Sequence, residues 1–321
     1  MIDRVANSYR VEYPGCISAH FPFIHQTSIM LPPPHPKPSM YGGSTDPSGK
    51  LDSVDEHRDH RNQVAVLWDG QVSAVIMKPA GLATQAPNDL PCLEQIVRQE
   101  FSTRSQYLAF PHRLDRPVSG LILVAFQKRA ARLLSSQFES RKIEKRYVAW
   151  VEGEVQNETV EWTDHLVKLP NQAKASVARS QDPGAKLAQT RMKLVHYDAK
   201  LDCSLLELHP ITGRMHQLRV QAASRGHCIL GDSLYGNCSR LSDGRADLLR
   251  LLTEPDSPEA RNPSSKIPGN QLTEDQQSKT SYGSPSSDWI ALRAESLAFF
   301  DPRNAQAVTV TAEKRWAELI P

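Results

Sequence analysis

One stretch of the sequence limits the fold more than any other. Residues 111–120, "PHRLDRPVSG", run directly into the apolar sequence "LILVAF". An apolar run of this length is typical of a strand buried on both faces, and it is far too short to cross a bilayer. We therefore predict a central strand over residues 118–126. The loop before it, where Asp115 lies between Arg113 and Arg116, is at an end of the sheet, where functional residues are often found.

Asp115 by itself has two interpretations. The simpler one is a surface carboxylate that neutralises Arg113 or Arg116, because exposed pairs of this kind are common. The alternative is a carboxylate held in place for chemistry, which requires a partner elsewhere in the chain.

Arg219 is the candidate partner. It lies in a predicted helix over residues 214–225 that ends at Gly226, and helical spacing places it on the core side. The apolar residues of that side are Met215, Leu218 and Ala222. A buried arginine requires an acidic partner, because an unpaired buried charge is costly. The other interpretation of Arg219 is a guanidinium that reaches the rim of the core.

A basic segment follows the central strand. From Lys128 to Arg146 there are seven Lys or Arg residues and two Glu, a local net charge of +5. The simplest interpretation is the solvated face of an amphipathic helix, but Lys128 and Arg132 also suit a surface that contacts phosphate. Tyr147 is either a core tyrosine or a ring that stacks on a nucleobase. Arg214 is expected to face solvent or a phosphate.

The periodicity of the chain predicts an α+β fold: a single domain on a mixed, mainly antiparallel sheet with flanking helices. Hairpins outnumber strand–helix–strand crossovers. Strands are predicted over residues 64–68, 72–77, 118–126, 146–152, 190–197 and 203–210 and in the apolar runs of 288–312, and helices over 93–101, 130–138 and 214–225.

Two segments do not fit this domain. Residues 1–62 form a Pro- and polar-rich N-terminal extension, which we expect to be disordered because it buries too little apolar surface. Residues 237–287 are polar and rich in Pro and Ser, which predicts a surface insertion within a domain that spans residues 63–321.

Composition excludes several classes of protein. The five cysteines are scattered and show no C-x-x-C spacing, so we expect reduced thiols, a cytoplasmic location and no metal site. Neither a secretory signal nor a membrane span is visible. Phosphate-loop, dinucleotide-binding, nucleophile-elbow and zinc-protease motifs are absent from the sequence. The net charge of +2 is too small to indicate a nucleic-acid partner by itself.

Five sequence blocks together resemble the RluA-type RNA pseudouridine synthases. In chain order they are "VIMKPAGLAT", "HRLDRPVSGLILVA", "KRYVAWVEG", "HPITGRMHQLRVQAASRGHCILGDSLYG" and "IALRAESLAFFDP". The resemblance covers residues 64–236 and 288–312. It implies an isomerase that converts uridine in large-subunit ribosomal RNA or transfer RNA to pseudouridine after flipping the base out of the stack.

The resemblance also assigns roles to residues. Asp115 takes the place of the family's nucleophile, Tyr147 that of its active-site tyrosine, and Arg219 that of the arginine paired with the aspartate. The sequence leaves open whether Asp115 attacks the ribose or promotes a glycal-type elimination. Because the reaction needs no redox step and no external reactant, no cofactor is expected. We expect RNA to be the partner of a monomeric protein. The expected RNA contacts, with Arg214 as above, are Arg113, Arg116, Lys128, Arg132, His216 and Gln217.

Three positions depart from the family pattern: Val118 and Met215 replace threonines, and Arg293 replaces a histidine. An S4-type RNA-binding domain, which precedes the catalytic domain in many relatives, is not expected in residues 1–62. Two alternatives remain at this stage. One is an RNA-binding module without activity, which the presence of Asp115, Tyr147 and Arg219 disfavours. The other is a glycosidic-bond hydrolase, disfavoured because the motifs place only one carboxylate.

Overall fold

The structure is a computed structural model, and it describes residues 64–87, 90–156, 158–236, 243–253, 289–312 and Trp316. The N-terminal extension, residues 1–62, and most of the polar segment 237–287 lie outside the described residues. The disorder predicted for residues 1–62 therefore stays a prediction.

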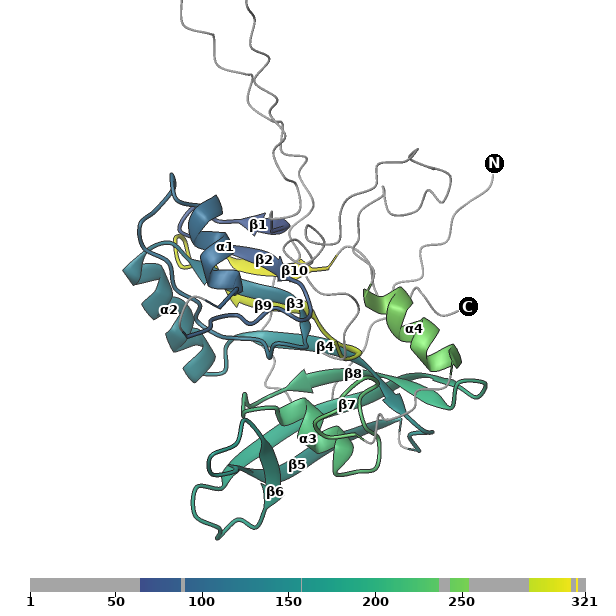
Figure 1. Cartoon of the computed structure of the whole chain (residues 1–321). Helices are drawn as coiled ribbons and strands as arrows, with labels where there is room; N and C mark the ends of the chain where they lie inside the picture. Colours follow the sequence, from purple (N-terminus) through teal and green to yellow (C-terminus); the bar gives the residue numbers. More distant parts are fainter. Residues whose placement is uncertain are drawn as a thin grey trace, which may run out of the picture. The chain divides into compact units, whose positions relative to one another are not determined.

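One sheet organises the described part of the chain (Figure 1). Its strands are β1 (Val66–Asp69), β2 (Ser73–Lys78), β3 (Ser119–Ala125), β4 (Glu144–Glu152), β5 (Thr159–Lys168), β6 (Ala175–Ala178), β7 (Lys186–Asp198), β8 (Cys203–Pro210), β9 (Leu292–Phe300) and β10 (Ala307–Thr311). Their order is β1-β2-β3-β9-β4-β8-β7-β5-β6, with β10 also paired to β9. Every described pair is antiparallel except β3 with β9. The predicted α+β class is confirmed.

Four helices are described: α1 (Leu93–Glu100), α2 (Lys128–Glu139), α3 (Gln217–Ala223) and α4 (Asp243–Thr253). The first two cover opposite faces of β2 and β3. Leu93 of α1 belongs to the same buried cluster as Ile122, whereas Leu134 of α2 belongs to the cluster of Leu121 and Leu123. Because β3 is covered on both sides, all its residues after Ser119 are buried. This explains its continuous apolar sequence.

The helix predicted over residues 214–225 is shorter than expected. It begins at Gln217 because His216 has the left-handed backbone conformation, with φ of 52°. Arg214 therefore precedes the helix and does not lie on its first turn. Leu218, Arg219 and Ala222 are buried as predicted, and Gly226 has the predicted left-handed conformation, with φ of +83°.

The segment 237–287 is not wholly a surface insertion. Within it lies α4, whose Leu252 is 7% exposed and belongs to the large buried cluster. The Nε of Arg245 donates a hydrogen bond to the carbonyl of Leu201 at 2.7 Å. Apolar side chains spaced three and four residues apart in "RADLLRLL" allow this helix to pack on the domain.

Strand β9 lies between β3 and β4, although it comes from the C-terminal part of the chain (Figure 1). Gly120 of β3 pairs with Ala294 of β9 in parallel register. A Cβ atom at Gly120 would lie 2.2 Å from the carbonyl oxygen of Ala294, and the φ of Gly120 is +119°. Only glycine allows the two backbones to come this close. The loop that carries Asp115 ends beside this contact.

Candidate active site

In the loop before β3, hydrogen bonds to the two residues next to Asp115 fix its position. The hydroxyl of Thr84 accepts a hydrogen bond from the backbone N–H of Leu114 at 3.2 Å and donates to the carbonyl of the same residue at 3.0 Å. On the other side, the N–H of Gly81 donates to the carbonyl of Arg116 at 2.9 Å. Both residues next to Asp115 are thus fixed to the segment 81–84. The Asp115 side chain itself remains 28% exposed.

A buried lysine completes this attachment. The Nζ of Lys78 donates three hydrogen bonds, to the carbonyls of Pro79 at 2.8 Å, Leu82 at 2.6 Å and Arg116 at 3.2 Å. Burial lowers the pKa of Lys78 to about 7, and the negative charge of Asp115 opposes that change. An ammonium has three donors, and these three carbonyls accept all of them. Lys78 therefore joins the end of β2 to the loop of Asp115.

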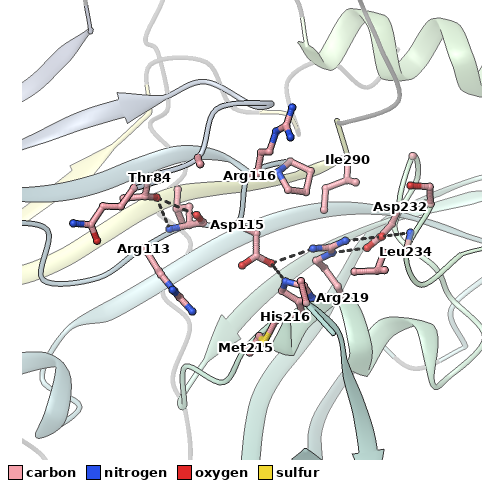
Figure 2. Close-up of a pocket in the computed structure, with 17 residues that line it drawn as sticks. Thr84, Arg113, Asp115, Arg116, Met215, His216, Arg219, Asp232, Leu234 and Ile290 are labelled. Carbon is pink, nitrogen blue, oxygen red and sulfur yellow. Dashed lines mark hydrogen bonds and ion pairs between the residues drawn. The ribbon is translucent and has the colours of Figure 1, made fainter. Parts of the chain in front are cut away.

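Arg219 approaches Asp115 from α3 (Figure 2). Its Nη1 lies 3.3 Å from Oδ2 of Asp115, so the predicted contact between these two residues is present. Its Nε and Nη2 donate to Oδ2 and Oδ1 of Asp232 at 2.7 Å and 2.8 Å. Burial would lower the pKa of Arg219, but the two carboxylates outweigh it and raise the pKa. The guanidinium is therefore charged and fixed in orientation.

Asp232 is the principal partner of Arg219. Its side chain is 1% exposed, and its Oδ1 also accepts backbone N–H groups from Leu234 at 3.1 Å and Tyr235 at 3.3 Å. Two-point pairing of this kind sets the guanidinium plane. The third direction of the guanidinium then points to Asp115, whose carboxylate is the more exposed of the two.

A cavity of about 500 Å³ opens at these residues. Asp115, His216 and Arg219 line it together with both arginines of the loop, Arg113 and Arg116 (Figure 2). Its apolar walls come from Pro117, Met215, Leu234 and Ile290. A polar centre between apolar walls in a cavity of this size is typical of a site for a small ligand or a single extruded nucleotide.

Tyr147 lies on β4, where it pairs with Leu208 of β8 and Ala294 of β9. Burial raises the pKa of its phenol, and the charge of Asp115 raises it further. The phenol is therefore protonated at neutral pH and near enough to Asp115 to sense its charge. Tyr147 packs against the large buried cluster and is not among the residues that line the cavity.

The residues expected to contact RNA are distributed unevenly. Arg113 and Arg116 are exposed, and both line the cavity together with His216. The Nε of Arg116 also donates to the carbonyl of Gly81 at 3.0 Å. Lys128 and Arg132 are exposed on α2 and are not among the cavity-lining residues.

Two expected RNA contacts have other partners in the structure. Gln217 is 4% exposed, and its amide bonds to Thr212 at 2.7 Å and Thr190 at 2.9 Å. This burial leaves it a role in packing α3, which argues against a direct RNA contact. The Nε of Arg214 donates to the carbonyl of Leu187 at 2.9 Å, which directs the side chain along β7.

Sequence reasoning missed Asp232, Lys78 and Tyr235. A signal for Asp232 existed, because a buried arginine requires an acidic partner and "GDSLYG" supplies one after α3. Gly-Asp is also a common turn sequence, so this pattern alone does not identify the partner. No grouping of His, Cys, Asp or Glu able to hold a metal occurs among the described residues. In the same part of the chain, no helix has the length and apolar character of a bilayer span.

Comparison with known proteins gives consistent results. Residues 72–224 match the family model described as RNA pseudouridylate synthase. The dual-specificity RNA pseudouridine synthase RluA of Yersinia pestis is 35% identical over 176 residues, 54% of this chain and 82% of that protein. The ribosomal large subunit pseudouridine synthase C of Vibrio vulnificus is 32% identical over 193 residues, 60% of this chain and 58% of that protein.

A further relative is the uncharacterized RNA pseudouridine synthase YhcT of Bacillus subtilis. It is 32% identical over 188 residues, which are 57% of this chain and 61% of that protein. The match thus spans about three-fifths of the length of YhcT and of synthase C. Among solved structures, human RNA pseudouridylate synthase domain containing 4 superposes with a TM-score of 0.55 at 21% identity. That superposition covers 78% of this chain and 89% of the human chain, and it supports the fold.

Proposed function

This chain belongs to the RluA-type RNA pseudouridine synthase family, and we propose from this that it isomerises uridine in RNA to pseudouridine at the cavity of Asp115. One observation carries the proposal. The carboxylate of Asp115 lies at a cavity, partly exposed, and is held by an arginine whose other donors are fixed by a buried carboxylate. A surface salt bridge needs no such arrangement.

The proposed reaction breaks the bond between C1′ of the ribose and N1 of uracil and forms a bond between C1′ and C5. The proton lost from C5 is balanced by the proton gained at N1, so oxidation state and composition are unchanged. Asp115 is the proposed nucleophile, which divides one difficult substitution into easier steps. Arg219 supports this role because its positive charge favours the ionised carboxylate and fixes its direction.

Tyr147 is proposed as the active-site tyrosine of the family. Because it packs against the buried cluster and does not line the cavity, stacking on the extruded base requires its ring to become accessible in the RNA complex. A phenol that remains protonated donates a hydrogen bond or stacks, and it does not act as a base at neutral pH. Arg113 and Arg116 are the proposed phosphate contacts at the cavity, because both are exposed beside Asp115.

The second carboxylate at the cavity does not favour a hydrolase. Asp232 lines the cavity, but two bonds to Arg219 and two to backbone N–H groups occupy it. Glycosidases that use two carboxylates need the second one free to act as an acid or base. Isomerisation requires only one such group here.

The RNA substrate is proposed at the level of class. The name of the Vibrio vulnificus relative refers to the large ribosomal subunit, and the Yersinia pestis relative is named a dual-specificity RNA pseudouridine synthase. We propose large-subunit ribosomal RNA or transfer RNA as the substrate of a monomeric, cytoplasmic enzyme.

The test is pseudouridine mapping of RNA from cells that lack the gene, complemented with wild type, Asp115→Asn or Asp182→Asn. Asp182 is a matched control because it lies in an exposed turn, where its carboxylate accepts the N–H of Arg179 at 2.8 Å. We expect at least one pseudouridine to disappear in the deletion and to return with wild type and Asp182→Asn only. If no site disappears, the activity is wrong, and if Asp115→Asn restores it, the role of Asp115 is wrong.

A further inference from the structure

His216 lies between the candidate nucleophile and a tyrosine that the proposed mechanism does not use. Its Nε2 is 3.7 Å from Oδ2 of Asp115, and its Nδ1 is 2.8 Å from the hydroxyl of Tyr235. The imidazole packs edge-on against the ring of Tyr235, with centroids 5.6 Å apart. With a side chain 12% exposed, His216 lines the cavity directly before α3.

The hydrogen bonds around Tyr235 indicate the position of the imidazole proton. The phenol oxygen accepts the backbone N–H of Ala175 at 2.8 Å. The one proton of the phenol then has an acceptor within reach at Nδ1 of His216. Donation to Nδ1 gives the phenol proton an acceptor, whereas the reverse direction leaves the phenol proton without one. In the favoured arrangement Nδ1 carries no proton, and Nε2–H faces Asp115.

The surrounding charges bear on the protonation state of His216. Burial lowers the pKa of the imidazole, the charge of Asp115 opposes this, and Arg219 lowers it again. The charged and titratable groups that face it are Asp115 and Arg113 from the loop before β3, Arg219 from α3, Asp232 and Tyr235 from the segment after α3, and Lys174 across the Tyr235 ring. The lowered pKa favours a neutral ring at pH 7.

We propose that neutral His216, held in its Nε2–H form by Tyr235, is a positioning residue for the carboxylate of Asp115. At 3.7 Å the contact is longer than a hydrogen bond, so in the free protein it acts through the dipole of Nε2–H and through packing. Arg219 and His216 then restrict Asp115 from two directions. The proposal adds to the proposed function a group that sets the orientation of the reacting carboxylate.

This arrangement has a consequence for pH. Protonation of His216 places a second positive charge beside Asp115 and reverses the bond to Tyr235, since both ring nitrogens then donate. A carboxylate held by two cations is a weaker nucleophile. The single-turnover rate is therefore expected to fall as pH falls through the pKa of His216.

The first experiment needs no substrate. Nitrogen-15 NMR of the full chain with labelled histidine, assigned by comparison with His216→Asn, reports which ring nitrogen carries the proton. We expect the Nε2–H form to dominate at pH 7 in wild type. In Tyr235→Phe, which retains the ring and removes the hydroxyl, this form should no longer dominate. A dominant Nδ1–H form or a charged ring at pH 7 would overturn the proposal.

The second experiment measures single-turnover rates against pH for three variants on the substrate RNA. His216→Asn tolerates the left-handed backbone and still reaches Tyr235, but it is too short to reach Asp115. We expect its rate to fall on the order of 100-fold, the effect of a misplaced reacting group. His216→Gln places an amide that does not titrate near the Nε2 position, so the rate should fall less and its decline should move to lower pH. His227→Gln is the control, because His227 contacts the carbonyl of Glu152 away from the cavity.

A wild-type rate in His216→Asn, or an unchanged pH profile in His216→Gln, would contradict the proposal. The kinetic part rests on the proposed function, whereas the NMR part does not. If no RNA is converted by wild type, the proposed function fails, while the tautomer is still decided by the NMR result.

Discussion

At the scale of single residues, Arg219 connects the buried core with the candidate site. It bonds Asp232, whose side chain is 1% exposed, and Asp115, the proposed nucleophile, whose side chain is 28% exposed. Arginine suits this position because its planar fork bonds one carboxylate at two points and still directs a donor at another. A lysine has the same charge but no fixed geometry.

We therefore predict that Arg219→Lys lowers the single-turnover rate on the order of 100-fold while retaining the fold. Arg219→Met should unfold more easily, by about 3–5 kcal/mol, because it leaves Asp232 buried without its partner. Urea unfolding and single-turnover assays distinguish these effects. The control is Arg225→Lys, since Arg225 contacts Asp164 at 2.9 Å with 29% of its side chain exposed. A wild-type rate in Arg219→Lys would contradict the prediction.

The same scale shows why part of the site was predictable. Helical spacing placed Arg219 on the core side, and the cost of a buried charge required a carboxylate near it. The identity of the carboxylates was harder to derive. Spacing in the sequence does not reveal that Asp232, 13 residues after Arg219, returns to bond it at two points. Nor does it reveal that His216 has a left-handed backbone, which shortens the helix and turns its ring toward Asp115 and Tyr235.

At the scale of elements, the junction of β3 and β9 depends on Gly120. Its φ is +119°, and a Cβ atom at this position would lie only 2.2 Å from the Ala294 carbonyl oxygen, so there is no room for a side chain. We predict that Gly120→Ala lowers the free energy of unfolding by at least about 3 kcal/mol, because strain and overlap act together. Thermal unfolding of the purified variants measures this change.

Gly213→Ala is the matched control for Gly120→Ala. A Cβ at Gly213 meets nothing within 4 Å, so we expect its unfolding temperature to remain near that of wild type. Equal unfolding temperatures for the two variants would show that β3 and β9 tolerate separation.

Elements were predictable where their apolar pattern was strong. The central strand, α1, α2 and the hairpin of β7 and β8 follow directly from periodicity. Strands β5 and β6 were not predicted. They lie at one side of the sheet and are only partly buried, so the apolar pattern in their sequences is weak. The sequence around helix α4 indicates a polar insertion, because the short apolar face of the helix is surrounded by Pro- and Ser-rich sequence. The apolar residues of "HCILGDSLYG" form no strand, and Ile229 makes only an isolated bridge to Val151.

At the scale of the whole molecule, α2 and the cavity are separate features. Lys128 and Arg132 are exposed on α2, and neither lines the cavity. We predict that Lys128→Gln with Arg132→Gln weakens RNA binding and lowers the salt slope by about 1.4–1.8, as expected for the loss of two phosphate contacts. The single-turnover rate at saturating RNA should remain unchanged. Filter binding across a salt series measures the slope.

The control for α2 is Lys200→Gln, which lies in the turn between β7 and β8, where its N–H donates to Asp198 at 2.8 Å. If the α2 variant binds RNA with the salt slope of wild type, its two basic residues do not contact phosphate. RNA recognition would then depend on Arg113, Arg116 and other residues of the cavity rim.

The position of β9 also determines when the site can form during synthesis of the chain. Within the described sheet, no strand from β1 to β3 pairs with a strand from β4 to β8; β9 joins the two sets. Asp115 lies in the loop before β3, in the first set, and Arg219 lies on α3, which follows β8 of the second set. A nascent chain that has emerged from the ribosome only as far as Tyr235 would contain every proposed catalytic residue but not the strand that brings them together. Ribosome-bound chains should therefore acquire activity only after the sequence of β9 has left the exit tunnel.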